Sequence, residues 1–382
     1  MALFTFSGGV HPADGKEFAK NSPITEYLPK GDVVLPLGQH IGAPAQPIVS
    51  KGDQVLVGQK VAEAGGFVSA NIFSSVSGTV KAIEPRMTPA GAKVNSIVIE
   101  NDGEFKEAAF EAKPYDQMSK DDVLAAIKEA GIVGLGGAGF PTHVKLAPKD
   151  PDAIEYIIVN GAECKPYITG DYRILMETPE LLIEGLNIVL DMFPKAKGII
   201  GIEDNKKDAI AKVEALVKGD ARISVATLKT KYPQGAERSL IYATTGRSIN
   251  SSMLPADAGC IVDNVATIVA IKEAVKDGKP LYERVVTVTG DAIKNPSNFK
   301  VRTGTNVQEL IEAAGGFKTQ PEKIISGGPM MGMAMFTTDV PAVKTFSCFL
   351  AFTKDEVAAN QPSNCIRCGR CVSVCPQKLM PA

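Results

Sequence analysis

The feature that most constrains this chain is a glycine-rich segment that runs into an apolar strand. It begins at Gly131 and reads GIVGLGGAGFPTHVK, ending at Lys145. Glycine adopts positive φ freely and lets a ligand approach the backbone. Residues 154–159 are an apolar run typical of a buried strand, and the polar residues 160–163 (NGAE) follow it. Open α/β sheets bind ligands at such strand ends, so the segment predicts a site for a phosphate-bearing ligand.

The glycine spacing alone does not identify that ligand. Gly134, Gly136 and Gly139 match G-x-G-x-x-G, the fingerprint of dinucleotide-binding folds. That fingerprint should follow a strand and open a helix, whereas here a predicted helix over residues 120–130 precedes the loop. The standard dinucleotide interpretation therefore fails on context. A mobile loop with no ligand is the alternative, which the particular sequence GGAGFPT disfavours.

Composition places the chain among ordinary globular proteins. It has 382 residues, 45% hydrophobic content and a net charge of −2, which predicts two to four domains. No basic tail or stripe indicates nucleic-acid binding. No apolar run is long enough for a transmembrane helix, and Asp14 and Glu17 make the start unlike a signal peptide. We expect a cytoplasmic protein, and these observations leave open that it docks on a membrane complex.

The N-terminal third predicts an arm and a small β module. Residues 1–30, with FSGGVHP near the start, predict an extended arm. Residues 31–100 resemble a lipoyl-like barrel-sandwich module. Its short strands are expected at Val33–Leu37, Gln54–Val57, Ser75–Ile83 and Ser96–Glu100. No lysine lies between Val61 and Val80, so the carrier function of such modules is absent and a structural or docking role is expected.

The central part predicts an α/β domain. Residues 101–120 are expected to form a linker, and Ser119 is the expected cap of the helix that follows. Strands and helices then alternate, which indicates a Rossmann-like, largely parallel sheet over residues 121–283. The predicted elements after the first strand are helix 179–193, strand 198–203, helix 206–218 and strand 223–227. Asp263 and Asn264 interrupt a later apolar run and could cap a helix, bind a ligand, or do both.

Residues 284–345 predict a β-grasp-like unit. Strand 284–290, helix 305–314 and strand 323–325 follow one another there. A structural spacer between cofactor domains is the favoured interpretation of this unit.

The C-terminal region, residues 346–382, carries the most specific motif. Its cysteines are spaced C-x2-C-x2-C-x3-C-P, at Cys365, Cys368, Cys371 and Cys375. This is the bacterial ferredoxin pattern, and it predicts the start of a ferredoxin-like 4Fe-4S domain. Zinc is the alternative, although four-cysteine zinc sites usually split into two distant pairs. The remaining cysteines, Cys164, Cys260 and Cys348, are expected to be buried small hydrophobes, with Cys164 of interest because it lies in the central segment.

Four segments in order carry a resemblance to a known family: GLGGAGFPTHVK, NGAEC-x-PYITGD, YPQGAERSLIY and VDNVAT. They resemble the flavin domain shared by the NADH-oxidising flavoprotein subunit of respiratory complex I and the C subunit of the Rnf complex. The FSGGVHP arm, the lipoyl-like module and ISGGPMMG point to the Rnf C subunit. The resemblance covers residues 4–380.

The resemblance implies noncovalent FMN with NADH stacked on it. The FMN contacts it implies are Gly134, Gly136, Gly137, Gly139, Lys145, Asn160, Glu163, Tyr232, Gly235, Asp263, Asn264 and Thr267. The NADH contacts it implies are Phe140, Lys165 and Glu237. In this pattern the glycine loop and Lys145 hold the FMN phosphate. No residue is expected to act as a catalytic acid, base or nucleophile, because the flavin supplies the chemistry.

The chain departs from the complex I pattern at three positions. Leu135 stands where that pattern has arginine, Ala162 where it has aspartate, and Lys165 where it has glutamate. The lysine reverses the charge beside the flavin, so NADH is expected to reduce the flavin less well than it would with glutamate at this position. Lys165→Glu is therefore expected to strengthen NADH-dependent flavin reduction and to leave FMN affinity unchanged.

The function implied is that of a peripheral electron-transfer subunit of a membrane-bound, ion-translocating NADH:ferredoxin oxidoreductase. Its expected partners are NADH, other subunits including an iron–sulfur subunit and, indirectly, ferredoxin. The family pattern has two 4Fe-4S clusters, and a second cysteine run would complete both. We expect this chain, which stops at Ala382, to have incomplete ligand sets and to be poorly ordered or cluster-free from about residue 360.

Two alternatives stay open at this stage. A related flavin and iron–sulfur cobalamin reductase of bacterial microcompartments has similar domains, but that branch typically lacks the lipoyl-like module. The other alternative is a docking subunit whose flavin site is vestigial. Ala162 and Lys165 fit this alternative, because both depart from the complex I pattern.

Overall fold

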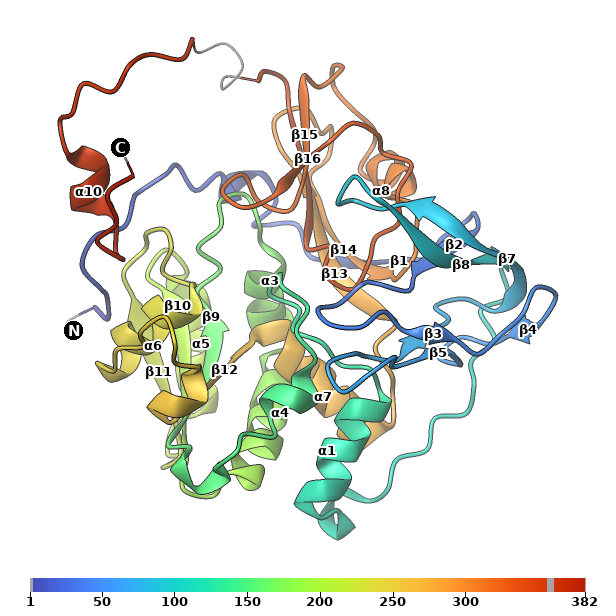
Figure 1. The fold of residues 1–382 in the computed structure, drawn as a ribbon, viewed down its shortest axis with the longest axis horizontal. Helices are drawn as coiled ribbons and strands as arrows, with labels where there is room; N and C mark the ends of the chain where they lie inside the picture. Colours follow the sequence, from blue (N-terminus) through green and yellow to red (C-terminus); the bar gives the residue numbers. More distant parts are fainter. Residues whose placement is uncertain (1–2, 356–360, 382) are drawn as a thin grey trace.

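The computed structural model describes residues 3–355 and 361–381 of the chain. Figure 1 shows a parallel α/β domain, a barrel-sandwich module and a mixed sheet that contacts both. Within the described part, no helix is long and apolar enough to cross a membrane. The multidomain α/β architecture predicted from the sequence is confirmed.

The central domain is built on four parallel strands in the order β11-β10-β9-β12. Their bounds are β9 (Tyr156–Gly161), β10 (Lys197–Glu203), β11 (Ile223–Leu228) and β12 (Cys260–Asn264). From β9 the chain winds outward through β10 and β11, and it then returns to the other side of β9 as β12. This reversal is a topological switch point, where open α/β sheets leave a crevice at the carboxyl ends of the strands.

Helices cover both faces of this sheet. Ile157 and Val159 of β9 pack into the core that holds α4 and α7, whereas Ile158 packs into the core that holds α6. Successive residues of β9 thus enter different cores, which is why the strand is apolar throughout. The helices are α1 (Lys120–Glu129), α2 (Thr142–Lys145), α3 (Gly170–Glu177), α4 (Pro179–Met192), α5 (Lys207–Leu216), α6 (Glu237–Thr245) and α7 (Val265–Asp277), with 3-10 turns at Tyr115–Gln117, Pro151–Ala153 and Pro255–Ala258.

Local sequence determines where these helices begin and end. Ser119 caps α1 as predicted, because its Oγ accepts a hydrogen bond from the Asp122 amide at 3.2 Å. Asn264 caps α7, because its Oδ1 accepts from the Ala266 amide at 2.9 Å. Asp263 is buried beside this cap and does not share the role. Gly278 ends α7 in the left-handed conformation at φ 65°.

The barrel-sandwich module consists of two small antiparallel sheets. One has the order β2-β8-β7-β4 and the other β3-β5-β6. Their bounds are β2 (Val33–Pro36), β3 (Gln46–Pro47), β4 (Gln54–Val55), β5 (Lys60–Glu63), β6 (Ile72–Phe73), β7 (Gly78–Met87) and β8 (Lys93–Asn101). Val33, Leu35, Ile97 and Ile99 alternate along β2 and β8 and point into the shared core.

The mixed sheet has the order β1-β14-β13-β17-β15-β16, with α8 (Val307–Ala313) in its core. Its strands are β1 (Ile24–Tyr27), β13 (Glu283–Thr289), β14 (Ser297–Arg302), β15 (Lys323–Ser326), β16 (Met333–Met335) and β17 (Cys348–Phe352). The sequence predicts this module over residues 284–345 only. The structure differs at both ends, since β1 comes from the predicted arm and β17 from the region assigned to the ferredoxin-like domain. β17 is almost wholly buried, and its own sequence, CFLAF, cannot indicate which strands flank it.

The two terminal segments meet beside the central domain (Figure 1). The Gly9 amide donates to the Val374 carbonyl at 2.8 Å, within the short helix α10 (Arg370–Val374). The N-terminal segment also contains the 3-10 turn Lys16–Phe18. Poor order was expected from about residue 360; that residue lies outside the described residues, whereas residues 361–381 are described and include α10.

Candidate functional site

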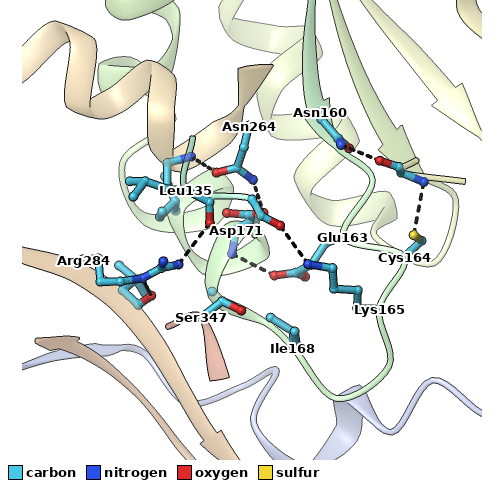
Figure 2. A pocket seen from close by; sticks show the side chains of 16 residues that line it. Leu135, Asn160, Glu163, Cys164, Lys165, Ile168, Asp171, Asn264, Arg284 and Ser347 are labelled. Carbon is cyan, nitrogen blue, oxygen red and sulfur yellow. Dashed lines mark hydrogen bonds between the residues drawn. The ribbon is translucent and has the colours of Figure 1, made fainter. Parts of the chain in front are cut away.

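A crevice lies at the switch point of the parallel sheet. Asn160 at the end of β9 is in register with Asn264 at the end of β12, and both line this crevice. The empty space along it, about 620 Å³, includes open solvent. Figure 2 shows how side chains from β9, β12, α3 and the mixed sheet converge on it.

The glycine loop forms one wall of the crevice. It closes on itself through a hydrogen bond from the Gly134 amide to the Phe140 carbonyl at 2.9 Å. The Leu135 amide donates to Oγ1 of Thr267, in the first turn of α7, at 2.9 Å. The loop thus lies against the amino-terminal end of α7, where unpaired amides and the helix dipole favour an anion.

Glycines are required where this wall approaches its neighbours. A Cβ on Gly136 would lie 3.2 Å from the Asn264 Cβ. Gly137 has a φ of +145° and faces the ammonium of Lys165, which a Cβ would meet at 3.3 Å. A side chain at either position would crowd the cradle, and at Gly137 it would also strain the backbone.

The turn after β9 brings acidic and basic groups into the crevice. Oε1 of Glu163 accepts from the Asp171 amide at 2.8 Å, at the start of α3. The Asp171 carboxylate accepts from Nδ2 of Asn264 at 2.6 Å. Desolvation in the crevice and the nearby charge of Glu163 raise the pKa of Asp171 to about 6. This side chain therefore changes protonation near neutral pH.

Two cations face these acids. Nζ of Lys165 donates to the Gly136 carbonyl at 2.8 Å and ties the turn to the glycine loop. Arg284 of β13 donates to the Leu135 carbonyl at 3.3 Å (Figure 2). It also donates to the Lys344 carbonyl. Burial lowers the pKa of Arg284 to about 10, so it stays charged at neutral pH. A carboxylate at position 165 would repel the Gly136 carbonyl, so Lys165→Glu would disturb the loop as well as the local charge.

Cys164 joins the turn to the segment after β11. Its Sγ accepts a hydrogen bond from the Gly235 amide at 3.1 Å, and Nδ2 of Asn160 donates to the Gly235 carbonyl at 2.8 Å. Burial raises the pKa of the Cys164 thiol, so it stays protonated at neutral pH. Cys164 is partly exposed, whereas Cys260 and Cys348 are buried as expected.

Lys145 lies in a separate ionic cluster. Its Nζ donates to the Val262 carbonyl at 2.7 Å and lies 3.4 Å from Asp263 and 3.7 Å from Glu237. Burial raises the pKa of Asp263, and Lys145 offsets only part of that rise. Within the described residues, both carboxylate oxygens of Asp263 lack a hydrogen-bond partner. Lys145 thus supports the end of β12 rather than lining the crevice.

The structure divides the residues expected to bind FMN and NADH into two groups. Those that line the crevice are Gly136, Asn160, Glu163, Lys165, Gly235 and Asn264. Those outside its lining are Gly134, Gly137, Gly139, Phe140, Lys145, Tyr232, Glu237, Asp263 and Thr267. Among the latter, Tyr232 exchanges backbone hydrogen bonds with Val10 of the N-terminal arm, 2.8 Å each.

Some lining residues had no assigned role in the sequence. Asp171 and Ile168 belong to the quoted motif NGAEC-x-PYITGD, so a signal for them existed. Arg284 and Ser347 come from the mixed sheet, far along the chain. No local pattern could have predicted them, because only the packing of that sheet against α3 brings them to the crevice.

The cysteine run is exposed. Cys365, Cys368 and Cys371 are exposed, and Cys375 is partly buried. Among the described residues, no group of three or more histidine, cysteine or acidic side chains lies close enough together to hold a metal ion. The four thiols and their spacing nevertheless suit the chemistry of a 4Fe-4S cluster.

Four family models match successive parts of the chain. They are the RnfC barrel sandwich hybrid domain at residues 4–104, the Nuo51 FMN-binding domain at 127–273, the SLBB domain at 285–334 and a 4Fe-4S binding domain at 361–378. The FMN-binding match spans the glycine loop and the crevice ends of β9 and β12.

Curated relatives match along nearly the whole chain. The C subunit of the proton-translocating ferredoxin:NAD⁺ oxidoreductase complex of Clostridium ljungdahlii is 47% identical, over 100% of this chain and 83% of that protein. The C subunit of the Na⁺-translocating complex of Acetobacterium woodii is 47% identical, over 99% and 86%. The C subunit of the ion-translocating oxidoreductase complex of Cronobacter sakazakii is 38% identical over 99% of this chain, which spans 49% of that longer protein.

A solved structure supports the fold. The NAD⁺-reducing [NiFe]-hydrogenase in its H2-reduced state matches with a TM-score of 0.50 and 22% identity, over 64% of this chain and 49% of that chain. At this identity the likeness concerns the fold alone.

Proposed function

Since the chain belongs to the family of C subunits of ion-translocating ferredoxin:NAD⁺ oxidoreductase complexes, we propose that it carries electrons between NADH and iron–sulfur centres through an FMN bound in the crevice. The observation that carries this proposal is the crevice at the switch point, where the glycine loop, the amino-terminal end of α7 and the turn after β9 meet. Its mixture of polar and apolar walls suits a flavin mononucleotide.

The residues present fit the cofactor. The cradle at Gly136 and Gly137 and the first turn of α7 would hold the phosphate, because backbone amides can approach it there. Asn160, Glu163 and Asn264 would supply directed hydrogen bonds to the rest of the molecule.

Bound FMN supplies the conversion between two-electron hydride chemistry and one-electron transfer. The chain contributes position and charge. Lys165 and Arg284 place positive charge at the crevice and would favour the more anionic, reduced cofactor. Asp171 could hold a proton near neutral pH, since its pKa is raised to about 6. Phe140 closes the glycine loop, because its carbonyl accepts from the Gly134 amide, and Glu237 belongs to the ionic cluster of Lys145. We assign both residues to NADH binding.

The cysteine run would carry the next step. Cys365, Cys368, Cys371 and Cys375 would bind iron–sulfur clusters and pass single electrons to another iron–sulfur subunit, and indirectly to ferredoxin. In this proposal the chain docks at the cytoplasmic face of the membrane complex as a peripheral subunit. The translocated ion differs between the two relatives at 47% identity, so we do not assign one to this chain.

Anaerobic titration of the purified chain with NADH tests the proposal. Bleaching of the visible flavin absorption in proportion to added NADH is the expected result. Flavin that NADH leaves oxidised would contradict the NADH assignment. Absence of flavin after incubation with FMN would favour the docking subunit with a vestigial site.

A matched pair of variants locates the flavin. Asn264 and Asn306 each cap a helix by accepting from the amide two residues on, at 2.9 Å in both cases. Only Asn264 lines the crevice. Asn264→Ala is expected to weaken FMN binding by roughly tenfold or more, since it removes both a cap and a crevice contact. Asn306→Ala, with the same loss of a cap, should bind FMN as the wild type does. Equal affinity in the two variants would contradict the site.

A further inference from the structure

The turn between Glu163 and Tyr167 has an unusual backbone. Both residues are non-glycine and have positive φ, 46° at Glu163 and 70° at Tyr167. Such conformations are strained and persist only where surrounding contacts enforce them. This turn carries Glu163 and Lys165 into the crevice, so whatever enforces its shape also shapes the proposed flavin site.

The N-terminal arm contacts both ends of this turn. The Tyr167 amide donates to the Asp14 carbonyl at 2.7 Å. Gly15 lies directly against the Tyr167 ring, where a Cβ would come within 2.5 Å of it. Phe18 stacks on the same ring with centroids 6.0 Å apart. The arm therefore packs against the strained residue Tyr167, whose ring also contacts Phe352 of β17 with centroids 5.3 Å apart.

Lys16 makes the closest set of contacts. Its ammonium donates to the Ile168 carbonyl at 2.5 Å, to the Lys165 carbonyl at 3.2 Å and to the Glu163 carboxylate at 3.5 Å. It is only 5% exposed, and the Glu163 side chain is 3% exposed. A buried lysine with three acceptors from one turn fixes that turn, because breaking such a set leaves buried charges unpaired.

We propose that Lys16 is a positioning residue for the flavin site, and that the N-terminal arm completes this site from outside the FMN-binding domain. The arm lies beyond the 127–273 match to that domain. Lys16 acts through the turn: it neutralises Glu163 from behind and keeps the Glu163 and Lys165 side chains directed into the crevice. The inference rests on the proposed function, since it assumes that FMN binds there.

The test compares two lysines of the same arm. Lys16→Met removes the ammonium beneath the turn, whereas Lys20→Met removes one that faces Asn205 and Asp208 instead. FMN affinity of the apoprotein, measured by quenching of flavin fluorescence, is expected to fall by roughly ten- to a hundredfold in Lys16→Met. Lys20→Met should retain wild-type affinity, and Lys16→Arg should restore most of it.

The midpoint potential of bound FMN gives a readout that a purely structural role would not move. Loss of a positive charge near the flavin should make the potential more negative in Lys16→Met, and Lys16→Arg should return it towards the wild-type value. Wild-type affinity and potential in Lys16→Met would overturn the inference. Failure of the wild type itself to bind FMN would instead overturn the proposed function.

A second variant covers the case in which Lys16→Met does not fold. Gly15→Ala keeps every charge but forces the arm away from the Tyr167 ring. A folded Gly15→Ala protein with weakened FMN binding supports the inference, and one with unchanged binding contradicts it. If neither variant folds, the arm is a general folding element and the assignment to the flavin site is overturned.

Discussion

The crevice at the switch point and the cysteine run differ in how much of each site the chain builds by itself. In the crevice, Glu163, Lys165, Asp171, Asn264 and Arg284 are each held by hydrogen bonds to other elements. In the cysteine run, three thiols are exposed. A backbone hydrogen bond from the Gly9 amide to the Val374 carbonyl of α10 links this region to the N-terminal segment. The side chains of the crevice are thus held in place by packing, whereas the cysteines are present but are not yet arranged around a cluster.

This difference has a physical reason. A flavin is held by shape and by many weak contacts, so its site must exist before the cofactor arrives. An iron–sulfur cluster forms strong bonds to thiolates, and metal binding supplies folding free energy to its own loop. The run can therefore remain open until the cluster and its remaining partners are present.

The largest expected effect separates the two regions completely. Cys368→Ser should lower the iron that the C-terminal segment takes up on reconstitution, because it removes one of the four thiols. FMN content should not change. Ile366→Ala, at an exposed position between the ligands, is the control and should retain iron. Loss of FMN in Cys368→Ser would mean that the two regions fold together.

The next effect concerns the glycine loop alone. Gly137→Val places a branched side chain at φ +145° against Lys165 and should weaken FMN binding by at least roughly a hundredfold. Gly219→Val is the matched control, because Gly219 has φ +91° and a Cβ there would meet no described atom within 4 Å. Flavin titration of both variants distinguishes backbone strain in general from damage to the crevice. Full flavin binding by Gly137→Val would show that the loop is not the site.

A smaller effect is expected at the link between the turn and the loop. Lys165→Met removes the hydrogen bond to the Gly136 carbonyl and should weaken FMN binding by roughly three- to tenfold. Lys165→Glu adds repulsion and should bind FMN less well than Lys165→Met. If Lys165→Glu instead binds FMN normally and is reduced faster by NADH, then the glutamate of the complex I pattern serves this position better than the hydrogen bond from Lys165 to the Gly136 carbonyl.

The last expected effect concerns stability rather than binding, and it depends on pH. The pKa of Asp171 is raised to about 6, so the folded state binds a proton that the unfolded state has already lost above about pH 4. Its contribution to the free energy of unfolding therefore falls as pH rises from about 4 to 6 and is then constant. Asp171→Asn, which can still accept from Asn264, should remove this slope, worth no more than about 3 kcal/mol. Urea unfolding of both proteins at several pH values measures this slope. An unchanged slope in Asp171→Asn would mean that another group binds the proton.

The parts of the molecule that the sequence predicted are those with local signals. The strand at β9, the caps at Ser119 and Asn264 and the cysteine spacing each depend on a short segment. The combination of glycine loop and polar strand ends also indicated the edge of the sheet where the crevice lies, because parallel strands bring their carboxyl ends together.

The parts that could not be predicted depend on contacts between distant segments. Arg284 reaches the crevice only because β13 packs near α3, and Lys16 reaches Glu163 only because the arm crosses the turn. The role of Lys145 as a direct phosphate contact follows from the family pattern and stays a prediction. In the structure its ammonium faces Asp263 and the Val262 carbonyl, outside the crevice lining.

Hydrogen–deuterium exchange of the whole chain with and without FMN tests whether FMN binds in the crevice and leaves the cysteine run unchanged, because it reports on both regions in one experiment. We expect slower exchange on FMN binding in the glycine loop, in residues 160–171 and at the start of α7, with no change in residues 361–381. Protection confined to other segments, or protection of the cysteine run to the same extent as the crevice, would contradict it.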